Sequence, residues 1–465
     1  MAARPSALAI ALASLTFLTL LAGFYRNAWR AADEKFFATN QLDTESLVIG
    51  RMARSAQRMA LSDGGLLGFV GDGPPRITFD TVELWVSKNF GYQTDAYTRG
   101  APIRSFSPYF SHSGLQGIGF SALDAVVPLP PSERKLRLFR AWTAALVAAG
   151  YALVVLWLRR ELGVGAALAC LLCLLVSPWL AAFSRNLYWS LWLFLLPPLA
   201  IGATLATPIR HRGRWLAGVG FATLLARFLA GYEFITASAA VAAAPVVYYA
   251  LRDRWPLRAT VRSLGLIAGA GAAALIVSLA ALTLQVAAVT GSARDAARHL
   301  RFAVGRRTSG DPHRLPPAYA AGLSATASDV VSSYVADRAD RGSDARRPAA
   351  LRWLNGWSYL EIIGLTLLAG VWAAIRARGR SAPNLVRARA LAAAVFVSLA
   401  GVLAWIVVFK AHSFNHLHVN PLMWHLLFLP LGAALVFCAA ADAVVLLGRA
   451  VSRLRWFARS EYPEP

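Results

Sequence analysis

The sequence predicts an all-α polytopic membrane protein with about ten transmembrane helices and two large outward loops. Its 465 residues are 57% hydrophobic, and their mean hydropathy is +0.50. A water-soluble core does not need so much apolar side chain, so lipid must solvate much of the surface. Long apolar stretches also recur along the chain, and arginines gather in alternate connections between them. These three observations define the expected class.

Ten apolar segments are long enough to cross about 30 Å of hydrocarbon. The first lacks a clear small-residue cleavage site, so we expect it to remain as an anchor. The boundary near Gly231 is expected because the polar stretch from Arg227 to Glu233 interrupts an apolar run. The ten segments are 7–25, 137–158, 163–183, 188–207, 214–231, 233–251, 263–290, 357–376, 389–409 and 421–447.

The placement of the arginines gives the expected orientation. If Arg4 is cytoplasmic, ten crossings put 19 arginines on the cytoplasmic side, whereas the short connections on the opposite side hold only Arg185 and Lys410. Cytoplasmic loops of membrane proteins carry such an excess of basic residues. We therefore expect both termini to be cytoplasmic, and the two large loops to lie on the other side.

The net charge of +23 does not indicate a nucleic-acid partner. The basic residues are 43 arginines and only 4 lysines, a skew that, with the abundant alanine, is typical of GC-rich coding. The three cysteines, Cys170, Cys173 and Cys438, lie inside apolar segments, where they act as small apolar side chains.

The chain divides into five regions by hydropathy: 1–25, the first membrane helix; 26–136, a large outward loop; 137–290, helices two to seven; 291–356, a second outward loop; and 357–465, the last three helices with a basic tail. The two loops hold 17 of the 24 acidic residues.

Helical and turn patterns organise both loops. In the first, a helix is predicted over 43–59, followed by a glycine- and proline-rich stretch and a strand-like run over 77–86. In the second, the pattern predicts an amphipathic helix over 294–304, a break over 310–317 and a helix over 328–340.

Asp43 and Glu45 are the candidate catalytic acids because they follow the first membrane helix closely. At the start of a helix, carboxylates are favoured by the macrodipole, so one interpretation is that Asp43 caps the helix and Glu45 is solvated. The functional interpretation is a carboxylate that removes a proton from an acceptor hydroxyl near the lipid headgroups. Asp33 and Glu34 form a second candidate pair.

The connection at 410–420 is rich in histidine and has one cation. Lys410, His412, His416 and His418 are expected to bind a phosphate or pyrophosphate. A transition-metal site is the alternative, but no carboxylate or cysteine lies nearby in sequence. Hydrogen bonding at a helix end is the third interpretation.

Four further residues, in three parts of the chain, are candidates for substrate binding. Arg227 and Glu233 lie at membrane depth, where ionisable groups usually face a cavity or each other. Arg185 stands beside Tyr188 and Trp189, which indicates either a lipid-phosphate contact or an interfacial aromatic belt with a snorkelling arginine. Gln116 belongs to a glycine-rich stretch, which predicts a tight turn and could also approach a ligand closely.

The predicted arrangement of helices and loops resembles that of the GT-C superfamily of integral-membrane glycosyltransferases, which use polyprenyl-phosphate sugars as donors. Within it, the chain looks like a family of bacterial membrane proteins from surface-polysaccharide contexts. The resemblance rests on the acidic first loop, the long late loop, about ten helices and four short strings, namely 43–51, 113–117, 231–234 and 410–420.

This resemblance implies a function, a location and roles for particular residues. Asp43 would occupy the place of the catalytic acid/base, with Glu45 as its alternate. Lys410, His412, Arg227 and Arg185 would contact the donor phosphate. Metal-dependent members have an acidic motif in the second outward connection, which here reads Ser184-Arg185-Asn186, so a divalent metal cofactor is not expected.

The expected activity is transfer of a sugar from polyprenyl phosphate to a hydroxyl of a lipid-linked or surface glycan, at the periplasmic face of the bacterial inner membrane. Membrane lipid, the sugar donor and the glycan acceptor are the expected partners. Three alternatives stay open. A polysaccharide polymerase or ligase would use 294–314 with His299 and His313; a flippase and a non-catalytic envelope scaffold are the others.

Overall fold

The protein is mostly helical, with helix over 75% of its residues. The structure is a computed structural model that describes residues 7–57, 61–73, 82–314, 317–378 and 382–460. Six helices in this part are long and apolar enough to cross a membrane, and three shorter apolar helices accompany them. A helical membrane protein with several spans is therefore confirmed.

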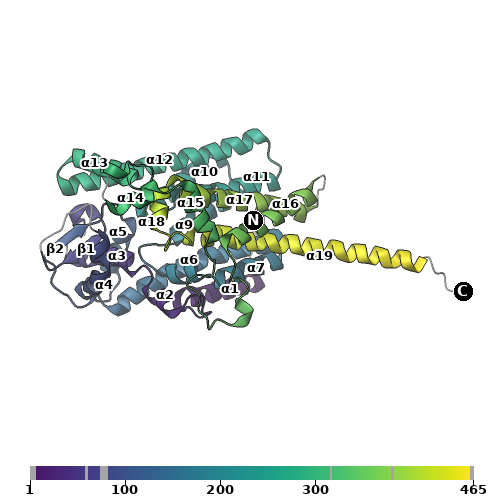
Figure 1. The fold of residues 1–465 in the computed structure, drawn as a ribbon, viewed down its shortest axis with the longest axis horizontal. Helices are drawn as coiled ribbons and strands as arrows, with labels where there is room; N and C mark the ends of the chain where they lie inside the picture. The colour runs from purple at the N-terminus through teal and green to yellow at the C-terminus, as the bar shows by residue number, and fades with distance from the viewer. Residues whose placement is uncertain (1–6, 58–60, 74–81, 315–316, 379–381, 461–465) are drawn as a thin grey trace.

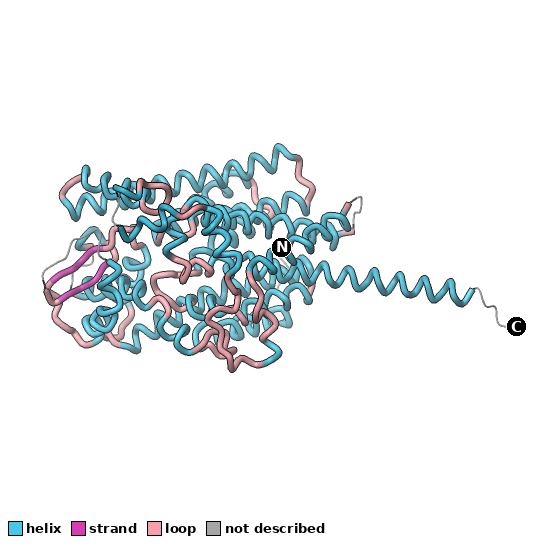
Figure 2. The backbone as a smooth tube through the Cα atoms, viewed as in Figure 1, coloured by secondary structure: helices cyan, strands magenta, loops and turns pink. Residues whose placement is uncertain are grey.

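The six long helices are α6 (Glu133–Leu162), α11 (Ile235–Arg252), α12 (Leu257–Thr290), α16 (Tyr359–Ala377), α17 (Pro383–Val408), and the π-helical turn η4 (Trp424–Phe428) continued by α19 (Leu429–Ser460). The shorter apolar helices are within α1 (Ala7–Arg26), α7 (Val164–Leu175) and α9 (Trp192–Ala206). Helix α10 (Arg212–Ala230) also coincides with a predicted segment. Figure 2 shows α19 extending well beyond the other helices.

Two of the predicted continuous segments are wrong in detail. The 163–183 segment is broken into α7 and α8 (Pro178–Phe183), because Ser177 caps a new helix and Pro178 takes its first position. The 188–207 segment is helical only from Trp192. The predicted separation near Gly231 is confirmed, since α10 ends at Ala230 and α11 begins at Ile235.

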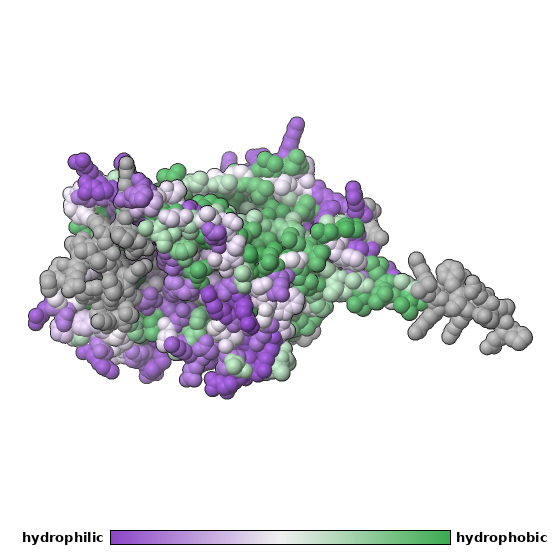
Figure 3. Space-filling model, in the orientation of Figure 1, coloured by the Kyte–Doolittle hydropathy of each residue, from purple (hydrophilic) through white to green (hydrophobic). Residues whose placement is uncertain are grey.

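Large apolar side chains stay exposed along the long helices. Ile276 and Leu284 of α12 are 66% and 71% exposed, and Leu368 of α16 is 69% exposed. On the face shown in Figure 3, hydrophobic side chains gather over the middle and upper part of the molecule, and hydrophilic ones lie along its lower edge and around α13. An exposed apolar surface of this kind matches a lipid environment.

The first loop folds into a small helical unit with a two-stranded sheet. Its elements are α2 (Glu34–Thr39), α3 (Leu42–Ala56), η1 (Ser62–Gly65), β1 (Gly68–Gly71), α4 (Val82–Thr98), β2 (Ser105–Pro108) and α5 (Leu115–Val126). Strands β1 and β2 pair antiparallel, with Gly68 opposite Pro108. A side chain at Gly50 of α3 would place its Cβ 2.2 Å from the Gly68 carbonyl oxygen, so this glycine lets β1 pack on α3.

The structure confirms the predicted helix at 43–59 over most of its length and corrects the predicted strand. Helix α3 covers Leu42–Ala56, and residues 58 and 59 of the predicted helix lie outside the described residues. Of the predicted strand at 77–86, residues 77–81 lie outside the described residues, and the chain from Val82 is helical. The sheet forms instead from two short segments that carry glycine or proline and lack a clear alternating pattern.

The second loop is helical too. It contains α13 (Ala293–Gly305), η2 (Pro312–Arg314), α14 (Pro317–Ser324), α15 (Ala327–Ala336) and η3 (Ala349–Leu351). The predicted amphipathic helix is thus confirmed as α13, and the predicted helix at 328–340 ends four residues early, at Ala336. Helix α18 (Lys410–Asn415) lies in the later histidine-rich connection.

The two loops pack against each other. The buried guanidinium of Arg347 donates to the carbonyls of Arg30 and Ala31, and the Asp33 amide donates to the Gly342 carbonyl at 2.8 Å. Gln285 of α12 donates to the carbonyls of Gly64 and Ser113, which joins the first loop to the helices. In Figure 1, α3–α5, the sheet and α13 gather at one end of the molecule, and α19 leaves from the other.

Candidate functional site

The short connection at 184–190 is the centre of the candidate site. The Asn186 carboxamide oxygen accepts from the amides of Tyr188 and Trp189 at 3.0 and 3.2 Å, which fixes a turn between α8 and α9. The Asn186 amide group donates to the Gln41 carbonyl at 3.0 Å. Arg185 donates to the Phe37 carbonyl, and its guanidinium carbon lies 3.8 Å from the centre of the Phe37 ring. The chain around 37–45 is therefore held directly against this connection.

Glu45 holds α3 in place. Its carboxylate accepts from Arg140 of α6, with the closest N–O distance 2.7 Å, and from the Leu187 amide at 3.2 Å. Only 2% of Glu45 is exposed. A carboxylate bound in this way by a guanidinium and a backbone amide is held firmly in position.

Asp43 lies on the same helix, but the surroundings of its side chain differ from those of Glu45. The helix is capped by Gln41, so Asp43 is its second residue and does not take the capping position that the sequence suggested. Its side chain is half-buried and, among the described residues, has no hydrogen bond or ion pair. The second candidate pair differs again, since Asp33 caps α2 through the Phe36 amide at 2.9 Å and Glu34 is 89% exposed.

A second group of side chains meets at Tyr188. We call it the Tyr188 cluster and define it as His112, Tyr188, Glu233 and Gln116. The Tyr188 hydroxyl donates to a Glu233 carboxylate oxygen at 2.9 Å, and the Nε2 atom of His112 lies 2.9 Å from the same hydroxyl. Because the hydroxyl proton points to Glu233, Nε2 of His112 must carry the proton that it donates to Tyr188. Gln116 donates to the Tyr188 carbonyl at 3.1 Å.

Several buried polar atoms around this cluster lack a hydrogen-bond partner within the described residues. They are Nδ1 of His112, Oε1 of Gln116, Nε of Arg227 and the indole nitrogens of Trp189 and Trp405. Buried polar atoms are usually satisfied, so a concentration of unsatisfied ones is typical of a binding site. Burial lowers the pKa of His112 to about 4, which keeps this ring neutral.

Arg227 supports the turn beneath the cluster. Its guanidinium donates to the carbonyls of Gly231 and Glu233 and lies 3.6 Å from the centre of the Phe194 ring. The expected pairing of Arg227 with Glu233 is therefore made through the backbone oxygen of Glu233. Its carboxylate points to Tyr188.

The histidines of the late connection form a stack. The rings of His412 and His416 are 4.0 Å apart and nearly parallel, and those of His416 and His418 are 5.7 Å apart. Burial, together with neighbouring histidines and arginines, lowers the pKa of His412 well below its usual value. No group of three or more His, Cys, Asp or Glu in the described ranges could hold a metal ion.

Lys410 donates hydrogen bonds to the second loop. Its ammonium donates to the carbonyls of Leu323 and Ala325 at 2.8 and 2.6 Å, at the end of α14. Two of its three protons are thus used, and this arrangement fits the helix-end interpretation better than a free phosphate ligand.

Arg307 is the cation that sequence reasoning left without an individual role. Its carbonyl accepts from the His412 amide at 3.2 Å, and its guanidinium donates to the Ser111 hydroxyl at 3.2 Å. No ion pair joins Arg307 to a carboxylate in the part of the chain that the structure describes. Burial and the neighbouring Arg306 lower its pKa, yet an arginine stays protonated in proteins.

A series of aromatic rings connects the 184–190 connection with the histidine stack at His412. Trp189 stacks on Phe234 at 5.7 Å, Phe234 meets Trp405 edge-on at 5.5 Å, and Trp405 meets His412 edge-on at 5.7 Å. Tyr188 and Trp189 are buried, at 5% and 7% exposure, so the aromatic-belt interpretation of these residues is wrong. Their position after α8 gave no signal of this burial, because interfacial and buried aromatics look alike in sequence.

The structure thus brings most of the predicted residues to one end of the molecule. Glu45 and Arg185 meet the 184–190 connection, and Gln116 and Glu233 meet at Tyr188. No protein-family model matches the chain, and a search of curated proteins finds no match. The site is therefore interpreted from its own geometry.

Proposed function

We propose that this chain transfers a sugar from a polyprenyl-phosphate donor to a hydroxyl of a lipid-linked or surface glycan. In the proposed topology, ten segments cross the bacterial inner membrane, both termini are cytoplasmic and the two loops form the periplasmic site. The observation that carries the proposal is the half-buried Asp43 carboxylate, which has no ion pair or hydrogen bond with any described residue, on a helix that Glu45 fixes to Arg140 and Leu187.

Asp43 is the proposed general base. It accepts the proton of the acceptor hydroxyl while the acceptor oxygen bonds to the anomeric carbon, with inversion there. The bond from that carbon to the phosphate oxygen breaks, and its electron pair leaves with the polyprenyl phosphate. A base must be held within reach of its proton but must not be neutralised by a partner, and Asp43 meets both conditions better than Glu45.

Arg307 and Arg185 are the proposed cations for the leaving phosphate, with His412, His416 and His418 as hydrogen-bonding neighbours. Neither arginine is ion-paired within the described residues, so their charge remains available. Preorganised cations stabilise a developing negative charge most strongly where water is scarce. Lys410 then has a positioning role at α14.

The test uses the purified full chain in proteoliposomes that contain a panel of polyprenyl-phosphate-linked sugars and a lipid-linked glycan acceptor. Release of polyprenyl phosphate is measured for wild type and for Asp43→Asn. We expect the variant to lose activity by a factor of about 100 or more, with unchanged thermal stability. Asp95→Asn, at a half-buried acid of the same loop that pairs with Arg99, is the control and should keep its rate. A wild-type rate in Asp43→Asn would exclude Asp43 as the base.

A polymerase- or ligase-like enzyme is the second candidate, because Arg307 belongs to the late loop and contacts His412. Full activity of Asp43→Asn combined with loss of activity in Arg307→Gln would favour it. Movement of a lipid-linked sugar across the vesicle membrane without release of polyprenyl phosphate would instead identify a flippase.

A further inference from the structure

A second polar site lies at the other end of the helices. It is a cavity of about 560 Å³ lined by Arg160, Glu161, Arg252, Asp253, Arg254 and Arg387, with Pro383 and Val386 as its apolar wall. These residues come from the C-terminal ends of α6 and α11, the turn that follows α11 and the N-terminal end of α17, and these three helices are long and apolar enough to cross a membrane. The cavity is therefore at the depth of lipid headgroups, whichever side of the membrane it faces.

Glu161 holds the lining of this cavity together, and its carboxylate is occupied by contacts with the surrounding side chains. Its carboxylate is 3% exposed and lies 3.0 Å from Arg252, 3.5 Å from Arg160 and 3.7 Å from Arg387. The Tyr248 hydroxyl donates to it at 3.0 Å. Asp253 pairs with Arg252 at 2.6 Å.

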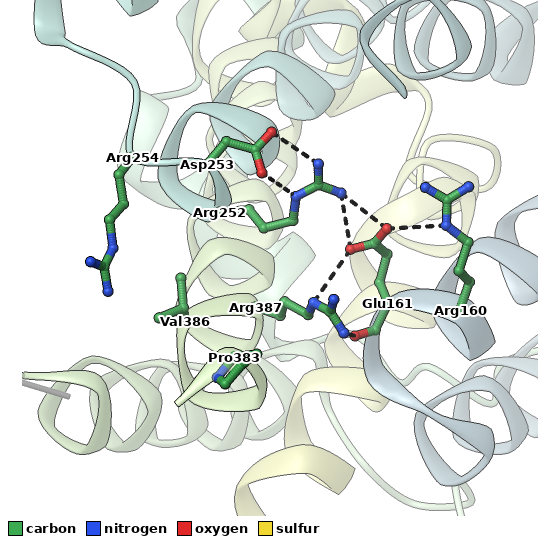
Figure 4. A pocket seen from close by; sticks show the side chains of 8 residues that line it. All are labelled: Arg160, Glu161, Arg252, Asp253, Arg254, Pro383, Val386 and Arg387. Carbon is green, nitrogen blue, oxygen red and sulfur yellow. Dashed lines mark hydrogen bonds and ion pairs between the residues drawn. The ribbon is translucent and has the colours of Figure 1, made fainter. Parts of the chain in front are cut away.

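The cavity carries more positive than negative charge. Four arginines face two carboxylates, so the lining has an excess of two positive charges. Arg254 is exposed and has no ion pair with a described residue, and Figure 4 shows it standing apart from the Glu161 network. Arg160 is 67% exposed and meets Glu161 through Nε, which leaves its terminal nitrogens available. The available charge is suited to a phosphate group.

The apolar surroundings favour a lipid over a free phosphate. Leu257 and Val261, on the first turns of α12 directly after Arg254, are 77% and 59% exposed. A headgroup in the cavity would therefore leave its acyl chains beside an uncovered apolar helix face. Basic pockets between membrane helices bind anionic headgroups in this manner.

We propose that this cavity binds the phosphate headgroup of an anionic phospholipid, with Arg254 and Arg160 as its ligands and the acyl chains along the start of α12. Glu161, Arg252 and Arg387 hold the helix ends at the spacing that the headgroup needs. This site is separate from the proposed transferase site and does not depend on it.

The test is native mass spectrometry of the detergent-purified full chain titrated with cardiolipin, with phosphatidylcholine and with glycerol phosphate. We expect the protein to bind cardiolipin in preference to phosphatidylcholine, and the double variant Arg254→Gln/Arg160→Gln to weaken that binding about tenfold or more. The control variant Arg294→Gln/Arg301→Gln removes two exposed arginines from the other end, on α13, and should bind as wild type does.

Three results would overturn the proposal. They are equal cardiolipin binding by wild type and the Arg254/Arg160 variant, the same loss in the α13 control, and binding of glycerol phosphate as tight as that of the lipid. Because both substituted arginines are exposed and the Glu161 pairs with Arg252 and Arg387 remain, the variant is expected to fold. Its melting temperature without added lipid, equal to that of wild type, checks this.

Discussion

The two ends of the helix bundle each contain a glutamate that accepts a hydrogen bond from a tyrosine, but the rest of each arrangement differs. At Glu161, Tyr248 is joined by three arginines, so the carboxylate is fully compensated. At Glu233, the hydrogen bond comes from Tyr188, and the nearby Arg227 donates to backbone carbonyls. The first arrangement joins helix ends, whereas the second leaves polar atoms available for a ligand.

The same contrast separates Glu45 from Asp43, two residues apart on α3. Glu45 is bound by Arg140 and the Leu187 amide, and Asp43 has no such partner among the described residues. A compensated buried carboxylate contributes to structure, and an uncompensated one beside a binding site is a candidate for chemistry.

The largest expected effect is on stability, at Glu161. Glu161→Gln removes the charge shared by three arginines and should cost about 2–3 kcal/mol, less than for a fully buried pair because Arg252 and Arg387 are partly exposed. Thermal unfolding in detergent measures this. Arg160→Gln is the control and should change stability by less than about 0.5 kcal/mol. An equal loss of stability in both variants would contradict the structural role of Glu161.

The next effect is a loss of stability in acid that involves His112. Because burial lowers its pKa to about 4 in the folded protein, the unfolded chain binds the proton first as the pH falls below about 6.5. The contribution of neutral His112 is complete above that pH and is lost toward pH 4, by about 2 kcal/mol at pH 5. His112→Gln should flatten the dependence of unfolding on pH, and His313→Gln, at an exposed histidine, should not. An unchanged slope in His112→Gln would contradict this environment.

The smallest expected effects are losses of stability on removing the hydroxyls of the two tyrosines, Tyr188 and Tyr248. Tyr188→Phe removes the hydroxyl between His112 and Glu233, leaving both unpaired there, and should cost about 1–2 kcal/mol. Tyr248→Phe removes one of several partners of Glu161 and should cost less than about 1 kcal/mol. Unfolding measurements on both variants check the order, and a larger loss for Tyr248→Phe would reverse the comparison.

The sequence predicted the helices well because apolar length and arginine placement are local signals. It missed the break at Ser177-Pro178, since the apolar run continues through it and only the cap and proline end the helix. The predicted strand starting at 77 failed from Val82 onward. The sheet formed in short segments where packing on Gly50, together with the hydrogen bonds of Gln93 to Val70, replaces a local pattern.

The sequence predicted which residues belong to the candidate site better than it predicted which of them contact each other. Asp43, Glu45, Arg185, Gln116 and Glu233 were each singled out, but their grouping depends on the 184–190 connection. The hydrogen-bonding roles of Tyr188 and Arg307 gave no local signal, because their partners lie 45 and 76 residues away in sequence for Tyr188 and 196 residues away for Arg307. Such long-range contacts cannot be derived from the pattern of one segment.

The most direct measurement of the central claim is mass spectrometry of the lipids that copurify with the full chain in mild detergent, for wild type, Arg307→Gln and the control Arg301→Gln. We expect a polyprenyl phosphate or its glycosylated form in wild type and in Arg301→Gln, and its loss in Arg307→Gln. Bulk phospholipid alone in all three proteins would contradict a polyprenyl-phosphate donor site at Arg307.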